Sequence, residues 1–154
     1  MNYWLMKSEP DTFSIDDLKN KPNSTEHWDG VRNYQARNMM RDKMKKGDLV
    51  FFYHSNCKPP GIVGIMQVAK ESYPDFTAHN PNSDYYDPKS TKDNPRWHMV
   101  DVKFKKKFKK IIPLEILKSQ IGLDNLVLIR KGNRLSIMPI SKQEWEVILN
   151  MSED

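Results

Sequence analysis

Cysteine, glycine and long apolar runs are scarce in this sequence of 154 residues. The single cysteine, Cys57, cannot form an internal disulfide, and it excludes every metal knuckle or redox pair that needs a CxxC motif. The six glycines contain neither a GxGxxG nor a GxxxxGK(S/T) spacing, so no phosphate-binding glycine loop is present. The longest apolar runs, such as Leu49–Tyr53, are far shorter than the roughly 20 residues of a bilayer-spanning helix. We therefore expect an intracellular protein of a reducing compartment, with no membrane partner.

Charge gives the first indication of a partner. The chain has 25 lysines and arginines against 20 aspartates and glutamates, a formal net charge of +5 and a sequence pI near 9.2. Such a balance favours an acidic partner, and nucleic acid is the usual candidate. The excess is moderate, so it does not exclude other partners.

The length predicts one domain spanning residues 1–154, and we see no repeat or low-complexity tract. Alternating or continuous apolar residues predict strands, and capping residues before amphipathic stretches predict short helices. Expected strands cover 3–6, 49–54, 62–68, 98–104 and 135–140, and expected helices follow Ser14, Asn33, Pro113 and Ser141. This order predicts a mixed α/β (α+β) fold, in which a curled sheet or small barrel carries helices on its flanks. Residues 72–96 form a long loop, a feature that is more often functional than idle.

The densest group of chemically versatile residues is Trp28–Asn38. It places an aromatic residue, a glycine, two arginines and several amides at the start of the helix that Asn33 caps. A helix N-terminus favours anions, arginine suits a phosphate or a base edge, and tryptophan offers a stacking face. The alternative is an ordinary capped helix with solvated arginines and a core tryptophan, and composition alone does not decide between the two.

A second group, Phe52–Asn56, lies at a strand end, where polar and aromatic residues can line a pocket. His54 with Cys57 could be read as a nucleophile pair, but no third group with suitable spacing orients them. The remaining histidines show no metal-ligand spacing, so we expect no metal and no cofactor. Paired-carboxylate catalysis has little support, because Asp16 and Asp17 fit helix capping.

The run Lys103–Lys110 contains six lysines around Phe104 and Phe108. It could contact phosphates at the rim of a binding site or serve as a nuclear address. Alternation places Phe104 and Phe108 on one inward face, which fits an edge strand whose lysines are solvated and block edge-to-edge aggregation, and this last reading is favoured.

Several of these segments together resemble the EVE domain family. The resemblance rests on Tyr3–Pro10, on the run VRNYQARN at 31–38 after Trp28, and on Gly47-Asp48 with Phe52–Asn56. Gly61–Gly64, Tyr85–Ser90, Pro95–Trp97 and Arg134–Pro139 also fit, so the resemblance covers essentially the whole chain. Met138 departs from the glutamine expected in many relatives.

The resemblance implies a PUA-like pseudo-β-barrel with flanking short helices, and a non-catalytic module that reads a modified base. Modified cytosine in DNA is the favoured ligand, and a modified base in RNA is possible. Carried over by position, the base-binding residues are Lys7, Ser8, Trp28, Arg32, Asn33, Gln35, Arg37, Asn38, Tyr53, His54 and Ser55. The absence of a basic N-terminal extension favours a stand-alone bacterial protein, cytoplasmic and monomeric; a eukaryotic member would be nuclear.

Two other functions remain open at this point. One is a small hydrolase or RNA-processing enzyme that uses His54 with Cys57 or Glu9. The other is a general RNA-binding PUA-like module without a base pocket.

Overall fold

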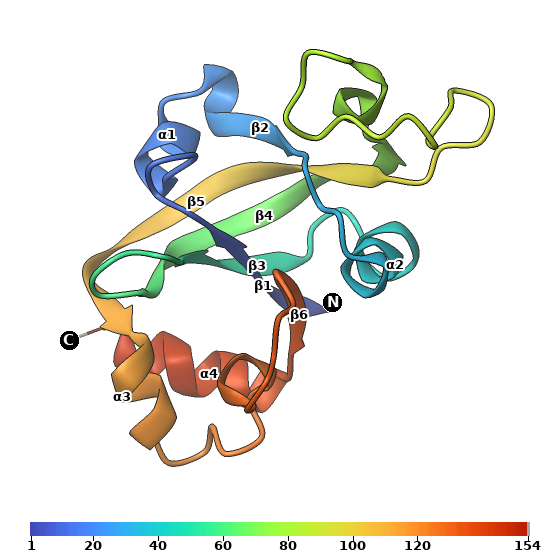
Figure 1. Cartoon of the computed structure of the whole chain (residues 1–154). Coiled ribbons are helices and arrows are strands. Elements are labelled where there is room, and N and C mark those ends of the chain that lie inside the picture. The colour runs from blue at the N-terminus through green and yellow to red at the C-terminus, as the bar shows by residue number, and fades with distance from the viewer. Residues whose placement is uncertain (154) are drawn as a thin grey trace.

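Six strands form one mixed sheet in the computed structural model, which describes residues 1–153 (Figure 1). The strand order is β2-β5-β4-β3-β1-β6; β1 runs parallel to β3, and the other neighbours are antiparallel. The strands are β1 (Tyr3–Ser8), β2 (Thr25–Trp28), β3 (Leu49–His54), β4 (Gly61–Pro74), β5 (His98–Pro113) and β6 (Ile137–Ile140). The helices are α1 (Ile15–Lys19), α2 (Tyr34–Asp42), α3 (Leu114–Ser119) and α4 (Lys142–Met151), with short 3-10 turns at Pro22–Ser24, Phe76–His79 and Val127–Ile129. This arrangement confirms the mixed α+β fold class.

Side-chain caps start three of the helices where the sequence predicts them. Ser14 and Asp17 form a reciprocal capping box, with oxygen–nitrogen distances of 3.1 and 2.8 Å. Ser141 and Glu144 do the same at 3.1 and 2.9 Å. Asn33 Oδ1 accepts from the amide of Ala36 at 2.9 Å. Such caps satisfy amides that the first turn of a helix leaves without partners, which fixes where each helix begins.

The sheet has an apolar cluster on each face, because successive side chains along a strand point to opposite sides. Trp4, Met6 and Phe52 belong to the cluster that α1 and α2 cover, whereas Leu5 and Phe51 belong to the cluster that α3 and α4 cover. Figure 1 shows α3 and α4 together below the sheet, away from α1, α2 and β2. The continuous apolar runs of β1 and β3 therefore reflect strands that are buried on both faces.

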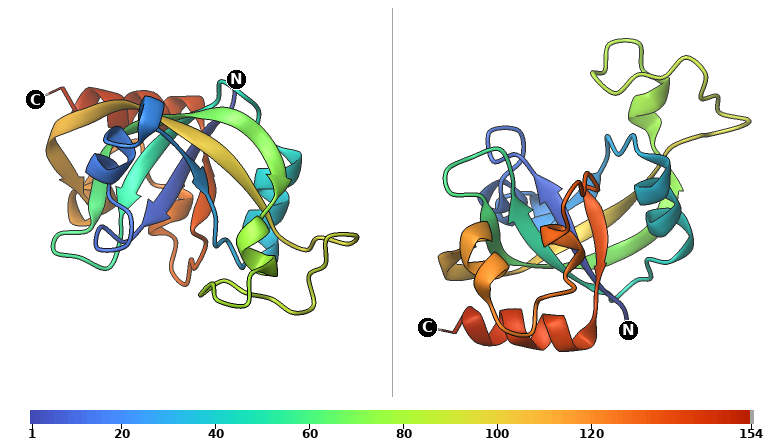
Figure 2. Two further views of the ribbon diagram at one scale, coloured as in Figure 1. Left: turned by 90° about the horizontal axis from the view of Figure 1, so that it is seen from above. Right: turned by 60° about the horizontal axis from the view of Figure 1, so that its bottom comes forward.

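Strands β4 and β5 are longer than the sequence predicts, and they curve along their length (Figure 2). Their shared ladder shifts register at four places. An extra residue at such a shift turns the following side chains to the opposite face. Phe104 consequently packs on the α1–α2 side and Phe108 on the α3–α4 side, so the single inward face expected for this strand is wrong.

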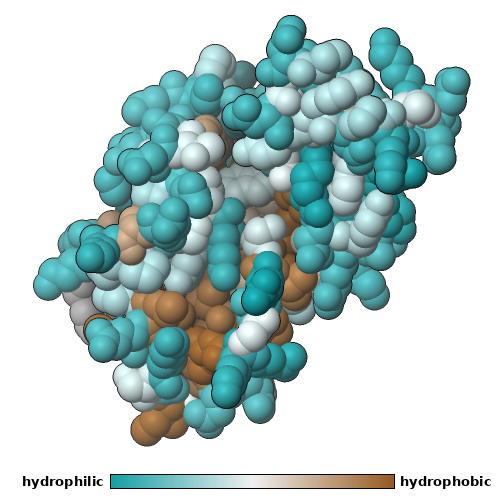
Figure 3. Space-filling view, in the orientation of Figure 1, coloured by the Kyte–Doolittle hydropathy of each residue, from teal (hydrophilic) through white to brown (hydrophobic). Residues whose placement is uncertain are grey.

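The two halves of the molecule differ in surface character. Figure 3 shows hydrophilic residues over the upper half, which holds α1, β2 and the connection between β4 and β5, and apolar residues gathered below, where α3 and α4 lie. The connection spans residues 75–97 and is called here the 75–97 loop. Its base is closed by a hydrogen bond from the amide of Asp75 to the carbonyl of Trp97 at 2.9 Å. None of the helices within residues 1–153 has the length and apolar character needed to cross a membrane.

Candidate functional site

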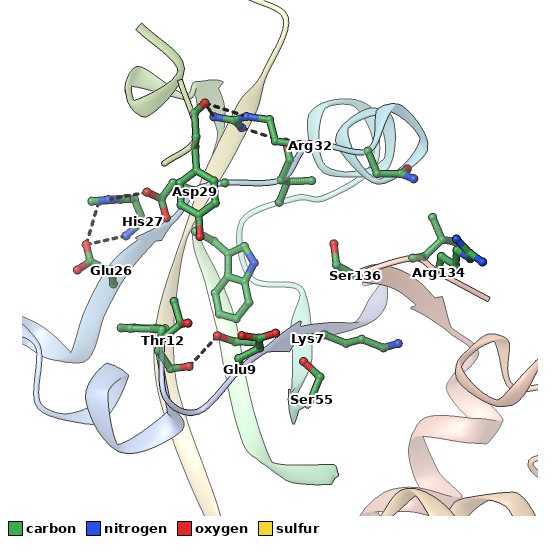
Figure 4. A pocket seen from close by; sticks show the side chains of 18 residues that line it. Lys7, Glu9, Thr12, Glu26, His27, Asp29, Arg32, Ser55, Arg134 and Ser136 are labelled. Carbon is green, nitrogen blue, oxygen red and sulfur yellow. Dashed lines mark hydrogen bonds and ion pairs between the residues drawn. The ribbon is translucent and has the colours of Figure 1, made fainter. Parts of the chain in front are cut away.

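A cavity of about 680 Å³ opens between the ends of β1 and β2 and the segment before β6 (Figure 4). Its volume lies in the range of pockets that hold a small ligand, about 300–1,000 Å³. Four separate stretches of chain and two isolated residues build it. The lining residues are Lys7–Glu9, Thr12, Phe13, Glu26–Asn33, Ser55, Tyr85 and Arg134–Ser136.

Strand ends supply the floor. The parallel strands β1 and β3 end side by side at Ser8 and His54, and β6 begins beside β1. Backbone hydrogen bonds extend the pairing past these ends, from the amide of Ser55 to the carbonyl of Ser8 at 3.0 Å and from the amide of Lys7 to the carbonyl of Ser136 at 2.8 Å. Three serines from distant parts of the sequence therefore meet at the cavity.

Trp28 ends β2, a short strand that the sequence analysis did not predict. Its side chain is 7% exposed and packs edge-on against Phe52, with ring centroids 5.4 Å apart, and against Phe13 at 6.1 Å. Aromatic pairs prefer such edge-to-face contacts, so both neighbours hold the indole in one orientation. The tryptophan is both a core residue and part of the cavity wall. The sequence had presented these two roles as alternatives.

Tyr85 lies directly over Gly30. A Cβ atom placed on Gly30 would meet the tyrosine ring at 2.6–2.8 Å, and Gly30 has φ +78°, a conformation that L side chains rarely adopt. Both facts favour glycine at this position. Through this close approach, Tyr85 of the 75–97 loop joins Trp28 and Asp29 in lining the cavity.

Arg32 ties the 75–97 loop to that wall. Its guanidinium donates to the carbonyl of Tyr85 at 2.7 and 3.2 Å and to Asp75 Oδ2 at 3.0 Å. Asp75, fully buried, also accepts from the amides of Gly30 at 2.9 Å and Thr77 at 2.8 Å. Burial alone would raise the pKa of Asp75, but hydrogen bonds from the Thr77 hydroxyl, the Gly30 amide and the Arg32 guanidinium hold it below its ordinary value. The arginine thus positions the wall rather than offering an unbound guanidinium to a ligand.

Acidic and basic side chains lie on opposite sides of the cavity. Figure 4 shows Glu9, Glu26 and Asp29 toward one side and Lys7 and Arg134 toward the other. Burial lowers the pKa of Lys7 and raises the pKa of Asp29. A ligand with an anionic end and an amino-bearing end would match this division.

The structure places six of the eleven residues proposed from the sequence at the cavity: Lys7, Ser8, Trp28, Arg32, Asn33 and Ser55. Some of their polar atoms are already engaged. The Ser8 hydroxyl donates to the carbonyl of Phe13 at 2.7 Å, and Asn33 Oδ1 caps α2.

The other five do not line the cavity. Gln35 and Asn38 are exposed on α2, and Arg37 donates to the carbonyl of Arg96 at 2.7 Å. Tyr53 is 3% exposed and belongs to the apolar cluster on the α3–α4 side of the sheet. His54 accepts from the amide of Ile15 through Nε2 at 3.1 Å, so it holds the start of α1.

The lysine run is separate from the cavity. Residues 103–110 lie on β5, none of them lines the cavity, and Lys107 pairs with Asp16 at 2.9 Å. The basic side of the site comes instead from Lys7 and Arg134. Arg134 was not among the site residues predicted from the sequence. It belongs to a polar stretch directly before a predicted strand, and that pattern is a signal that could have identified it.

Glu9 and Tyr85 were also missed as lining residues. Glu9 follows the end of β1, so a search for polar residues just beyond strand ends would have included it. Tyr85 comes from the middle of the 75–97 loop, and no local pattern shows that this part of the loop folds back on Gly30.

The pair His54 and Cys57 lacks the features of an activated nucleophile. The His54 nitrogen is engaged with Ile15, and burial raises the pKa of the Cys57 thiol, the opposite of what a reactive thiolate needs. Within residues 1–153, no three His, Cys, Asp or Glu side chains gather as a candidate metal site.

Comparison with known proteins identifies the family. The EVE domain model matches residues 2–151. The chain belongs to the EVE domain family. Human thymocyte nuclear protein 1 is 48% identical over 169 residues, covering 99% of this chain and 74% of the human protein.

Solved structures of EVE relatives agree closely with this fold. A crystal structure of the human protein in complex with DNA containing 5-methylcytosine has a TM-score of 0.95 and 48% identity, covering 100% of this chain and 99% of that one. A crystal structure of a Pseudomonas putida protein has a TM-score of 0.93 and 49% identity, covering 97% of this chain and 99% of that one. The resemblance seen in the sequence is therefore confirmed.

Proposed function

We propose that this EVE domain binds nucleic acid and reads a modified base, with 5-methylcytosine in DNA the favoured ligand, in the cavity beside Trp28. The observation that carries the proposal is a buried, fixed indole in the wall of a polar cavity large enough for a nucleotide. The human relative that was solved with 5-methylcytosine DNA, at 48% identity over the full length of this chain, supports the same ligand class.

The energetics require several contacts. Taking a base out of a duplex costs a few kcal/mol. Stacking on one aromatic side chain returns about 1–3 kcal/mol, and burying a methyl group adds about 0.8 kcal/mol. Stacking on Trp28 therefore needs support from hydrogen bonds to the base and from phosphate contacts by Lys7 and Arg134. We propose no catalytic step.

The test compares binding of DNA with and without a single 5-methylcytosine. Trp28→Leu keeps an apolar side chain among Phe13 and Phe52 but removes the stacking face, so the preference for the modified base is lost and affinity falls about 5- to 150-fold. Arg134→Ala, on the basic side of the cavity, removes a proposed phosphate contact, so it weakens binding of modified and unmodified DNA alike and reduces the salt slope by about 0.9.

Two outcomes contradict this assignment. A wild-type protein that binds both DNAs equally would show that the domain is not a reader of this base. A Trp28→Leu variant that folds and retains the full preference would show that the base binds elsewhere. Thermal unfolding of each variant establishes that the protein measured is folded.

A further inference from the structure

A reader of 5-methylcytosine has to reject thymine, and a methyl pocket cannot do this. Both bases carry a methyl group at C5 and have nearly the same shape. They differ at position 4, where cytosine has an amine and thymine a carbonyl, and at N3, which accepts in cytosine and donates in thymine. If the proposed function holds, the side chain that separates the two bases must therefore accept a hydrogen bond from the 4-amino group.

The acidic side of the cavity offers three carboxylates, and two of them have other partners or little burial. Glu26 accepts from the His27 amide at 3.0 Å and pairs with His27 Nδ1 at 2.9 Å and Lys21 Nζ at 3.2 Å. Glu9 is exposed at the edge of the cavity and accepts from Asn56 at 3.2 Å. Neither combines a free oxygen with a desolvated position.

Asp29 does combine them. Its side chain is 31% exposed, and Nε2 of His27 lies 3.9 Å from its carboxylate, beyond hydrogen-bond distance (Figure 4). Burial raises the pKa of Asp29, and the opposing effects of His27 and of the Asp29 backbone amide do not compensate for the water that the carboxylate has lost. Asp75 is the contrast within the same wall, since it is buried deeper but has hydrogen bonds from Gly30, Arg32 and Thr77.

The backbone holds Asp29 on both sides. Trp28, the residue before it, is fixed in the core by Phe13 and Phe52. Gly30, the residue after it, donates its amide to Asp75 at 2.9 Å. A hydrogen-bonding group discriminates well only when its surroundings fix its position, and this short segment supplies that condition.

We infer that Asp29 is the specificity-determining residue of the cavity, and that its carboxylate accepts a hydrogen bond from the exocyclic amine of the bound base. A base with a carbonyl at that position would bring two acceptors together and leave the half-buried carboxylate without a donor. The inference rests on the proposed function and extends it: the cavity takes amino-bearing bases, with 5-methylcytosine preferred over thymine.

The experiment uses single-stranded oligonucleotides that differ at one position, so that mispairing in a duplex does not contribute. That position carries 5-methylcytosine, cytosine, thymine or 5-methyl-2-pyrimidinone, which keeps the methyl group and lacks the amine. We expect wild-type protein to bind 5-methylcytosine about 10-fold or more tightly than thymine and the pyrimidinone. In Asp29→Asn, an amide can donate to a carbonyl, so the preference over thymine should fall about 10-fold while the preference over cytosine remains.

Glu9→Gln is the matched control, because it neutralises a carboxylate at the exposed edge of the same cavity and should leave the thymine ratio unchanged. An unchanged ratio in Asp29→Asn, or a fall in Glu9→Gln alone, overturns the inference. So does equal binding of 5-methylcytosine and the pyrimidinone by wild-type protein, a measurement that needs no variant to fold. Equal binding of 5-methylcytosine and cytosine would instead refute the proposed function, so the two failures are distinguishable.

Discussion

Replacing Gly30 by alanine would place a methyl group against the ring of Tyr85, at 2.6–2.8 Å from three of its carbons. Two costs follow. The left-handed backbone at φ +78° costs an L residue about 1–2 kcal/mol. The ring must also move from the position that it shares with Arg32, whose guanidinium lies 5.5 Å from the ring centroid, and losing that cation–π contact costs about 0.5–1 kcal/mol. The expected loss in the free energy of unfolding is therefore about 1.5–3 kcal/mol.

Gly132 provides a control with the same backbone conformation. Its φ is also +78°, but nothing lies within 4 Å of a Cβ placed on it. Gly132→Ala should therefore lose only the backbone share, about 1–2 kcal/mol. Denaturant unfolding of both variants measures the difference. Measured in a Tyr85→Ala background, Gly30→Ala should cost no more than Gly132→Ala, because the ring that the new methyl group would meet is absent. Equal costs for Gly30→Ala and Gly132→Ala, with no effect of Tyr85→Ala, would refute the claim that Tyr85 rests on Gly30.

Two further predictions concern the supports of the cavity. Arg32→Lys keeps the positive charge but loses the planar guanidinium, so we expect the free energy of unfolding to fall by about 1–3 kcal/mol and proteolysis within the 75–97 loop to become faster. The control Arg41→Lys changes an exposed pair with Asp42 and should alter neither the stability nor the cleavage rate. Equal cleavage rates in the two variants would contradict the anchoring role of Arg32. Burial lowers the pKa of His54 below its ordinary 6.5, so the unfolded chain takes up a proton first and the free energy of unfolding falls as the pH drops through about 6.5. His54→Gln should reduce that slope in denaturation measurements, and an unchanged slope would contradict it.

Local signals predicted most of the fold. The capping residues Ser14, Asn33 and Ser141 fixed three helix starts, because a cap depends on a few neighbouring residues. The turn at Gly47-Asp48 placed β3 correctly for a similar reason. The length of β5 and the opposite directions of Phe104 and Phe108 depend on register shifts against β4, which no single segment encodes.

The site was harder to predict, because its residues meet only through long-range pairing. Trp28 stood out by its type, although the strand that it ends went unrecognised. Arg32 was noticed for its chemistry, but its use as an anchor depends on Asp75 and Tyr85, more than 40 residues away in sequence. Gln35 and Asn38 looked like pocket residues because they adjoin Asn33 in sequence, whereas α2 turns them to solvent.

Because the base of the 75–97 loop is closed, the part of the cavity wall that this loop forms can be replaced without changing the strands. Asp75 and Trp97 are joined by a backbone hydrogen bond, and Asp75 is also fastened to Gly30 and Arg32, so the segment between them leaves the sheet and returns to it at one point. Residues 76–96 can therefore change in composition or length without altering the strands that fold the domain. Replacing this insertion would change the part of the cavity wall that Tyr85 forms, while Trp28, Asp29 and the strand ends stay the same.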